Sequence, residues 1–448
     1  MSALAESRIT LKLAFPLIIG QVSQMLLGVA DTMMIGKLGV TELAVLTFAN
    51  SLFYVPFVFG IGVLTSISVF TSNAHGSKNQ AAGRASCRHG MYVGTILGLI
   101  LFAVMSVVSW NLGIFGQPEA VQERTGLFFR IIMASMVPAL MSIVLKNHAD
   151  ALDRPWPPFW IFLWGVVLNV FLNWVMIYGK LGCPRLGLEG AAWATLISRF
   201  AILIAMFIWL YKAKGMREWV PYHWFKTPVM SDIKRFLAIG VPASIQMIAE
   251  VSAFSGAGLM MGKFGETAMA AHQVALMCAA TAFMIPLGLS MALSVRVGSA
   301  VGAGEMLRLR PIAISGWVIG AGYSLCAAVF FLFFGAWLAS LYTDVSPVID
   351  LAARIMIVVG VFQLVDSLQV CSVSMLRGLQ DARIPAMIDF VAYWILGIPM
   401  GIWLSVHMGY GAIGVWCGLA IGLFFACIML VPRLWKMTGR LAATGNPV

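Results

Sequence analysis

Charged residues are scarce in this sequence. Asp, Glu, Lys and Arg make up only 10% of the 448 residues, whereas hydrophobic residues make up 60%, and the mean hydropathy is +0.92. Soluble globular domains carry about 25% charged residues. The composition therefore excludes an ordinary water-soluble fold and predicts that most of the chain is surrounded by lipid.

The sequence also lacks the motifs of ATP-driven and hydrolytic chemistry. It contains no G-x-x-x-x-G-K-[ST] phosphate-binding loop, no G-x-S-x-G motif and no H-E-x-x-H motif. No polar segment is long enough to form an ATP-binding domain. We therefore predict no enzymatic activity, no cofactor and no use of ATP. An ion gradient can supply the energy instead, because one charge crossing 100 mV is worth about 2.3 kcal/mol.

Cysteine pairs and a cleavable leader are missing as well. The seven cysteines are scattered mainly through apolar runs without a C-x-x-C spacing, so they predict neither a zinc site nor a disulfide framework. The first apolar run is too long for a signal-peptide core, lacks a small-residue cleavage site and contains Asp31. We expect it to be retained as a membrane span.

Long apolar runs are what the sequence does contain. Each is about 20 residues or longer, enough for a helix to cross a hydrocarbon layer roughly 30 Å thick. We predict an all-α polytopic membrane protein with twelve transmembrane helices. Their approximate limits are 11–35, 46–71, 90–115, 127–148, 159–178, 190–211, 236–261, 269–297, 311–335, 350–376, 386–407 and 411–432.

The positive charge is unevenly distributed between these runs. A net charge of +11 is compatible with nucleic-acid binding, but the basic residues cluster in alternate loops, on the same side as the N-terminus. This pattern is the positive-inside bias of cytoplasmic loops. We therefore predict cytoplasmic termini, a location in the cell inner membrane, and no nucleic-acid partner.

The two halves of the chain repeat one another. Pro16 falls on Pro242 at a shift of 226 positions, and the same shift aligns about 80 residues without a gap, including Gly62 with Gly288. Each half holds six spans, so we predict two pseudo-symmetric six-helix lobes related by an axis along the membrane normal. The predicted domains are an N-terminal lobe at 1–211, a cytoplasmic linker at 212–235 and a C-terminal lobe at 236–448.

Two acidic residues stand out in the second half. A charge at bilayer depth costs at least about 2.5 kcal/mol on insertion scales, so Glu250 and Asp366 are functional candidates. Helical spacing places Glu250 on one face with Gln246, and Asp366 near Gln363 and Gln369. Two carboxylates close together would share a proton or bind a small cation such as Na⁺. Alternatively, each acid hydrogen-bonds only to a neighbouring helix.

The first half offers a different polar set. Asp31 lies seven residues after Gln24 on the first span, and the repeat places Gln24 opposite Glu250. Asn169 and Asn173 share a face of the fifth span, and Thr195 lies on the sixth span. Together with Asp31 they would form a second cation or proton site, or else a set of amide hydrogen bonds between helices. We predict that Asp31 and the glutamines Gln24, Gln246, Gln363 and Gln369 line a substrate cavity.

Two further charged residues lie within predicted spans. Arg199 lies one turn beyond Thr195 and needs a buried partner that the sequence does not identify. Asp389 falls in the first turn of the eleventh predicted span, where a helix N-terminus favours an anion, so we interpret it as structural.

Four stretches resemble the multidrug and toxic compound extrusion (MATE) family, NorM branch, over essentially the whole chain. They are PLIIGQVSQMLLGVADTMMIGKLG, GVPASIQMIAEVSAFSGAGLMMGKFG, AAHQVALMCAATAFMIPLGLSMALSVRVGSAVGAG and FQLVDSLQVCSVSMLRGLQDARIP. The resemblance implies two six-helix lobes around a V-shaped cavity. It also implies export of organic cations in exchange for Na⁺ or H⁺, with coupling roles for Asp31, Glu250 and Asp366. The archaeal branch has an Asn and an Asp one turn apart on the fifth helix, whereas this chain has Asn173 at the second position.

Three functions follow as hypotheses. The first is secondary-active multidrug efflux by alternating access, with a cation or proton bound at Glu250 and Asp366 and small cationic amphipathic drugs or dyes as substrates. The second is a lipid-linked oligosaccharide flippase of a related fold, whose polyanionic cargo would favour arginines over acids. The third is a non-transporting receptor or scaffold. We expect the bilayer as the main partner and a monomer as the functional unit, although the sequence carries no signal for oligomeric state.

Overall fold

The fold is helical throughout the part of the chain that the structure describes. A computed structural model describes residues 3–445. The first half contains α1 (Ala3–Gly36), α2 (Val40–Gly76), α3 (Gln80–Ser109), η1 (Leu112–Phe115), α4 (Glu119–Ala134), α5 (Met136–Ala151), α6 (Trp156–Tyr178), α7 (Leu188–Lys212) and η2 (Arg217–Trp219). The second half contains α8 (Met230–Met261), η3 (Gly262–Phe264), α9 (Glu266–Gly302), η4 (Met306–Arg308), α10 (Leu309–Ser340), α11 (Ser346–Gly378), α12 (Arg383–Phe390), η5 (Val391–Gly397), α13 (Ile398–Ile402), η6 (Trp403–His407) and α14 (Gly411–Thr444).

Twelve of the helical segments within residues 3–445 are long and apolar enough to cross a membrane, which confirms the predicted number. The fourth consists of α4 and α5, and the eleventh runs from α12 to η6, where η5 and η6 are π-helical. The third segment ends earlier than predicted. Helix α3 stops at Ser109. Asn111 is non-helical and precedes the short η1 helix, which the left-handed Gly116 ends.

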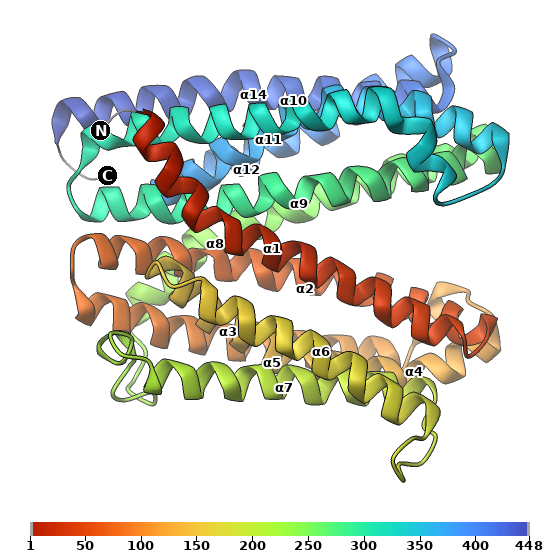
Figure 1. The fold of residues 1–448 in the computed structure, drawn as a ribbon, viewed down its shortest axis with the longest axis horizontal. Helices are drawn as coiled ribbons and strands as arrows, with labels where there is room; N and C mark the ends of the chain where they lie inside the picture. Colours follow the sequence, from red (N-terminus) through yellow and green to blue (C-terminus); the bar gives the residue numbers. More distant parts are fainter. Residues whose placement is uncertain (1–2, 446–448) are drawn as a thin grey trace. The chain divides into compact units, whose positions relative to one another are not determined.

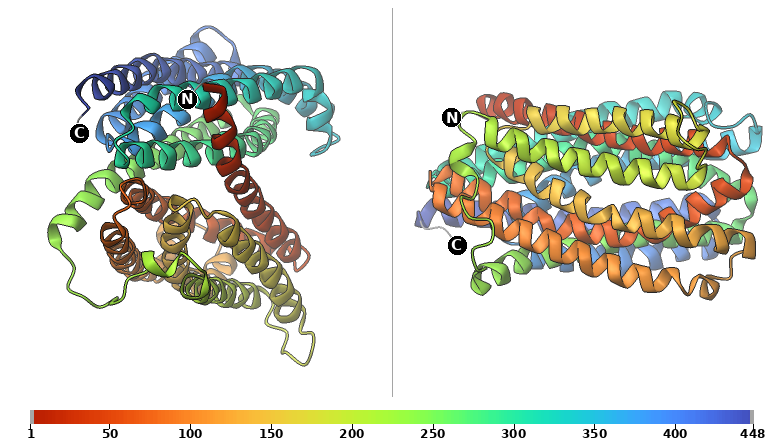
Figure 2. Two further views of the ribbon diagram at one scale, coloured as in Figure 1. Left: turned by 60° about the vertical axis from the view of Figure 1, so that its left-hand side comes forward. Right: turned by 90° about the horizontal axis from the view of Figure 1, so that it is seen from below.

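The chain folds into two compact units. The N-terminal unit is Val22–Ser244, and the C-terminal unit combines the chain up to Gln21 with Ile245–Val448. The division therefore lies within α1 and α8. Within the C-terminal unit α11 packs against α9, α10 and α14, and within the N-terminal unit α2 packs against α3 and α5, as the ribbon views show (Figures 1 and 2).

The segment 212–235 packs on the N-terminal unit. The carbonyl oxygen of Trp219 lies 3.1 Å from Nε2 of the buried His148, whose Nδ1 lies 3.1 Å from the hydroxyl of Thr71. On α3, Tyr92 donates its hydroxyl to the carbonyl oxygen of Trp224 at 2.8 Å. These bonds hold the connection between α7 and α8 against the helices of its own unit.

A buried ionic cluster anchors the first turns of α1 in the C-terminal unit. Glu6 is fully buried, and its carboxylate accepts hydrogen bonds from Arg296 of α9 and from Arg308. Arg296 also donates to the carbonyl oxygen of Glu6 at 2.8 Å and to the hydroxyl of Thr10. Sequence analysis did not single out Glu6 or Arg296, although Arg296 lies inside the eighth predicted span and is a charge that needs a partner.

Small residues allow the eleventh and twelfth spans to pack closely. A Cβ atom built on Gly418 of α14 would overlap the backbone of Gly401, and one on Gly422 would lie 2.8 Å from the Cα atom of Gly397. Gly397 and Gly401 are four residues apart, as are Gly418 and Gly422, the spacing that brings helix backbones together in membranes. The backbones of the eleventh and twelfth spans are therefore in direct contact at these glycines, and a larger side chain would not fit between them.

We expect Gly418→Val to destabilise the protein. The added side chain must displace the backbone of Gly401, and such overpacking typically costs about 1–3 kcal/mol or more. Thermal melting of the purified protein in detergent measures the loss. Gly322→Val is the matched control, because Gly322 lies on an exposed part of α10 and a Cβ atom there meets nothing within 4 Å. Equal melting temperatures for the two variants would contradict the close packing.

Candidate functional site

The densest polar cluster of the C-terminal unit is built from three segments. Helix α8 provides Gln246 and Glu250, α11 provides Gln363, Asp366, Gln369 and Arg377, and the eleventh span provides Asp389 and Tyr393. Asp366 is 3% exposed and Asp389 is 1% exposed. The cluster thus places carboxylates away from solvent and lipid, where every polar atom needs a partner inside the protein.

Hydrogen bonds connect the three segments through Asp389. Gln246 donates its side-chain amide to Oδ2 of Asp389, and Gln369 donates to the same oxygen at 2.7 Å. Arg377 then donates to Oε1 of Gln246 at 2.6 Å. Gln246 therefore bridges a guanidinium group and a carboxylate.

Glu250 and Asp366 belong to this cluster. Asp366 interacts electrostatically with Glu250 and Asp389, and Glu250 interacts with Asp389 and Arg377. The structure thus brings together the two acids that the sequence placed on separate helices. Gln363 is 1% exposed and donates to the carbonyl oxygen of Ala279 at 3.0 Å, so it joins α11 to α9.

Several buried oxygen atoms of the cluster have no hydrogen-bond partner within the described residues. They are Oδ1 of Asp366, Oδ1 of Asp389, Oε1 of Gln363 and the hydroxyl of Tyr393. Carboxylate, amide and hydroxyl oxygens are the ligands that hard cations such as Na⁺ and Ca²⁺ prefer, and a carboxylate also accepts a proton. These oxygens are of the chemical kind that binds a small monovalent cation or protons.

The predicted position of Asp389 in the first turn of the eleventh span is wrong. Helix α12 begins at Arg383, so Asp389 lies beyond its first turn and does not cap its N-terminus. Its carboxylate instead accepts hydrogen bonds from two other helices. A carboxylate inside the apolar run 386–407 was the signal available from sequence, and the wrong starting point of the helix concealed it.

The N-terminal unit holds the second predicted polar set in one chain of hydrogen bonds. Asn173 donates to Oδ1 of Asp31 at 2.6 Å and to Oδ1 of Asn169 at 3.1 Å. Asn169 donates to the hydroxyl of Thr195 at 3.3 Å. The hydrogen bonds described for this network do not include Gln24, whose side chain is exposed. This chain of hydrogen bonds therefore joins α1, α6 and α7.

Arg199 has partners that sequence analysis could not name. It donates to the hydroxyl of Ser135 at 2.7 Å, and its guanidinium carbon lies 5.1 Å and 5.5 Å from the ring centroids of Phe53 and Phe57. It also interacts electrostatically with Asp31. Contact with aromatic faces stabilises a desolvated cation. Arg199 thus supplies positive charge near the acid of the N-terminal unit.

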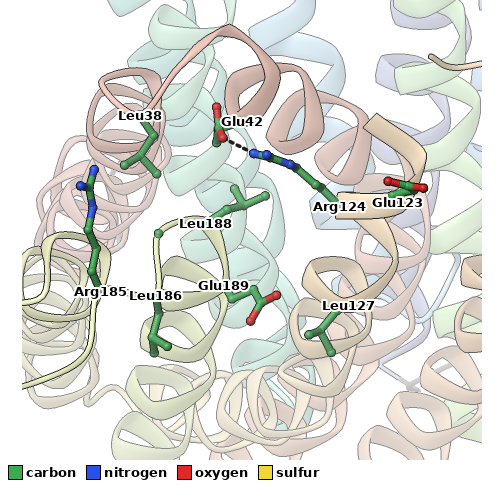
Figure 3. Close-up of a pocket in the computed structure, with 10 residues that line it drawn as sticks. Leu38, Glu42, Glu123, Arg124, Leu127, Arg185, Leu186, Leu188 and Glu189 are labelled. Atoms are coloured by element: carbon green, nitrogen blue, oxygen red, sulfur yellow. Dashed lines mark hydrogen bonds and ion pairs between the residues drawn. The ribbon is translucent and has the colours of Figure 1, made fainter. Parts of the chain in front are cut away.

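A pocket of about 480 Å³ opens at one end of the N-terminal unit. It lies among the start of α2, helix α4 and the connection between α6 and α7, with the Glu42 and Arg124 side chains paired at its edge (Figure 3). Glu123 and Glu189 also line it and are exposed. None of the residues predicted to couple ions is among the lining residues.

Comparisons with known proteins give one family. A family model described as MatE matches residues 16–175 and 242–403. A protein of Agrobacterium fabrum named "Probable multidrug resistance protein NorM" is 32% identical over 98% of this chain and 95% of its own length. "Multidrug resistance protein MdtK" of Proteus mirabilis is 30% identical over 96% of this chain and 95% of its own length.

Solved structures agree in fold. The crystal structure of the eukaryotic MATE transporter AtDTX14 covers 98% of both chains with a TM-score of 0.88 at 20% identity. That of the Vibrio cholerae MATE transporter VcmN in its bent form has a TM-score of 0.87 at 21% identity, covering 99% of this chain and 98% of VcmN. The repeated helical halves, the buried carboxylates and the full-length similarity agree: the chain is a multi-pass membrane protein that belongs to the MatE family.

Proposed function

We propose that this protein is a multidrug efflux antiporter that exports organic cations in exchange for Na⁺ or H⁺. The observation that carries the proposal is the buried cluster around Glu250 and Asp366, in which one carboxylate oxygen of Asp366 and one of Asp389 have no hydrogen-bond partner among residues 3–445. The names of the NorM and MdtK relatives support multidrug resistance as the outcome. We further propose an inner-membrane location, cytoplasmic termini and a monomer as the working unit.

Exchange follows from competition for negative charge. A Na⁺ ion or protons bound at Glu250 and Asp366 neutralise the carboxylates, and a neutral site attracts an organic cation less strongly. Coupling also requires that the ion and the drug favour different conformations of the protein, because a ligand shifts an equilibrium only by its difference in affinity for the two states. Alternating access then turns an inward ion gradient into outward drug movement.

The charge of the clusters favours this function over flipping of a polyanionic lipid-linked sugar. The C-terminal cluster contains the carboxylates of Glu250, Asp366 and Asp389 against the guanidinium of Arg377. An excess of carboxylates repels phosphate groups and attracts ammonium and other organic cations. A drug-like cation is therefore the substrate that the cluster suits.

We expect Glu250→Gln and Asp366→Asn each to abolish gradient-driven efflux. Both changes remove the negative charge for which ion and drug compete, while keeping the side-chain shape. Ethidium efflux from proteoliposomes, driven separately by a Na⁺ pulse and a pH jump, measures the effect and identifies the coupling ion. Exposed Glu119→Gln and Asp344→Asn are the matched controls. Wild-type efflux in Glu250→Gln, at equal membrane levels, would refute the proposed coupling site.

We expect Asn173→Asp to make the stability of the protein depend on a cation. The substitution places a second carboxylate within hydrogen-bond distance of Asp31, where Asn173 now donates at 2.6 Å, and two ionised carboxylates repel at that range. Acid or Na⁺ should then raise the melting temperature of the variant more than that of the wild type. Gln24→Glu on exposed α1 surface is the control. An identical response in wild type and variant would show that the Asp31 network does not accept a cation.

A further inference from the structure

We propose that Asp389 balances the charge of Arg377, so that Glu250 and Asp366 keep the double negative charge needed to bind the coupling cation. In this proposal Asp389 sets the ion affinity of the C-terminal site through its charge. The inference rests on the proposed function, because it concerns the same site. The sequence alone did not indicate this role for Asp389.

The first argument is the hydrogen-bond geometry of Asp389. Its carboxylate is 1% exposed, and one of its oxygens accepts two side-chain amide hydrogen bonds, from Gln246 on α8 and Gln369 on α11. Amide N–H donors converging on one oxygen are partners suited to a carboxylate anion. The position is built to hold a negative charge.

The second argument is the link from Asp389 to Arg377. Gln246 receives a hydrogen bond from Arg377 at 2.6 Å and gives one to Asp389, so the two charges are joined through a single amide side chain. Arg377 interacts electrostatically with Asp389 and with Glu250. Without Asp389, the positive charge of Arg377 would act on Glu250 alone.

The third argument is the charge count of the cluster. When all three carboxylates are ionised, their charges and that of the guanidinium group sum to −3 + 1 = −2, whereas loss of the Asp389 charge leaves −2 + 1 = −1. A smaller negative charge binds Na⁺ or protons more weakly, because attraction across a buried site scales with charge. The charged and titratable groups that face Asp389 from the surrounding helices are Glu250, Asp366, Arg377, Tyr393 and Cys427.

Two single variants test the sign of the effect. Asp389→Asn should weaken cation binding, on the order of tenfold for a unit charge at this depth. Arg377→Gln should strengthen it, because its removal leaves −3. The readout is the melting temperature of the purified, full-length protein titrated with NaCl at fixed pH and with acid at fixed NaCl. A ligand that binds only the folded state stabilises it by RT ln(1 + [L]/Kd), so the ligand concentration at which the melting temperature begins to rise reports the affinity.

The double variant Asp389→Asn with Arg377→Gln tests charge balance directly. The charge of its cluster is again −2, so the ion concentration at which its melting temperature begins to rise should return close to that of the wild type. A merely structural role for Asp389 predicts instead that the double variant is no better than Asp389→Asn. If Asp389→Asn fails to fold, Arg377→Gln and the double variant still test the sign and the return.

The outcomes separate this inference from the proposed function. Stabilisation of the wild type by neither Na⁺ nor acid would refute ion coupling itself. If the wild type is stabilised, three results would overturn the role of Asp389 and leave the antiport proposal standing. They are an unchanged ion affinity in Asp389→Asn, a weaker affinity in Arg377→Gln, and no recovery of affinity in the double variant. Because no drug transport is measured, loss of drug binding cannot imitate either result.

Discussion

The structure depends on one constraint: lipid offers no hydrogen bonds, so every charge placed inside a span must be satisfied by another helix. Several intramembrane charges consequently join helices that are distant in sequence. Glu6 joins α1 to α9, Asp31 joins α1 to α6, and Arg199 joins α7 to the residue between α4 and α5. The costly residues that mark function therefore also determine which helices meet.

The internal repeat supplies a common scaffold but not a common charge pattern. The halves share glycines and prolines at matching positions, yet Gln24 stands opposite Glu250 and Asp31 stands opposite Ala257. In the N-terminal unit an asparagine donates a hydrogen bond to one acid, and in the C-terminal unit a guanidinium group interacts electrostatically with Glu250 and Asp389. The duplicated fold thus carries two electrically different sites.

Sequence could predict the membrane class, the twelve spans, the repeat and several polar positions, because these depend on composition and helical spacing alone. Gln246 and Glu250 share a face by their separation of four residues, and no knowledge of neighbouring helices is needed. The partners of Arg199, Arg296 and Asp389 could not be predicted. They depend on the rotation and depth of one helix against another, and a single sequence gives no measure of either. The predicted start of the eleventh helix lay three residues too late, at 386 instead of Arg383, and this placed Asp389 wrongly in the first turn.

The anchoring of Glu6 has a consequence for how the protein is made. Glu6 leaves the ribosome 290 positions before Arg296. Until α9 has entered the bilayer, the first turns of α1 lack the guanidinium group that satisfies their acid. Membrane insertion of the first helix and its final docking are therefore separate events, divided by the synthesis of more than half the chain. The first turns of α1 therefore reach their final contacts only after Arg296 and Arg308 have been made.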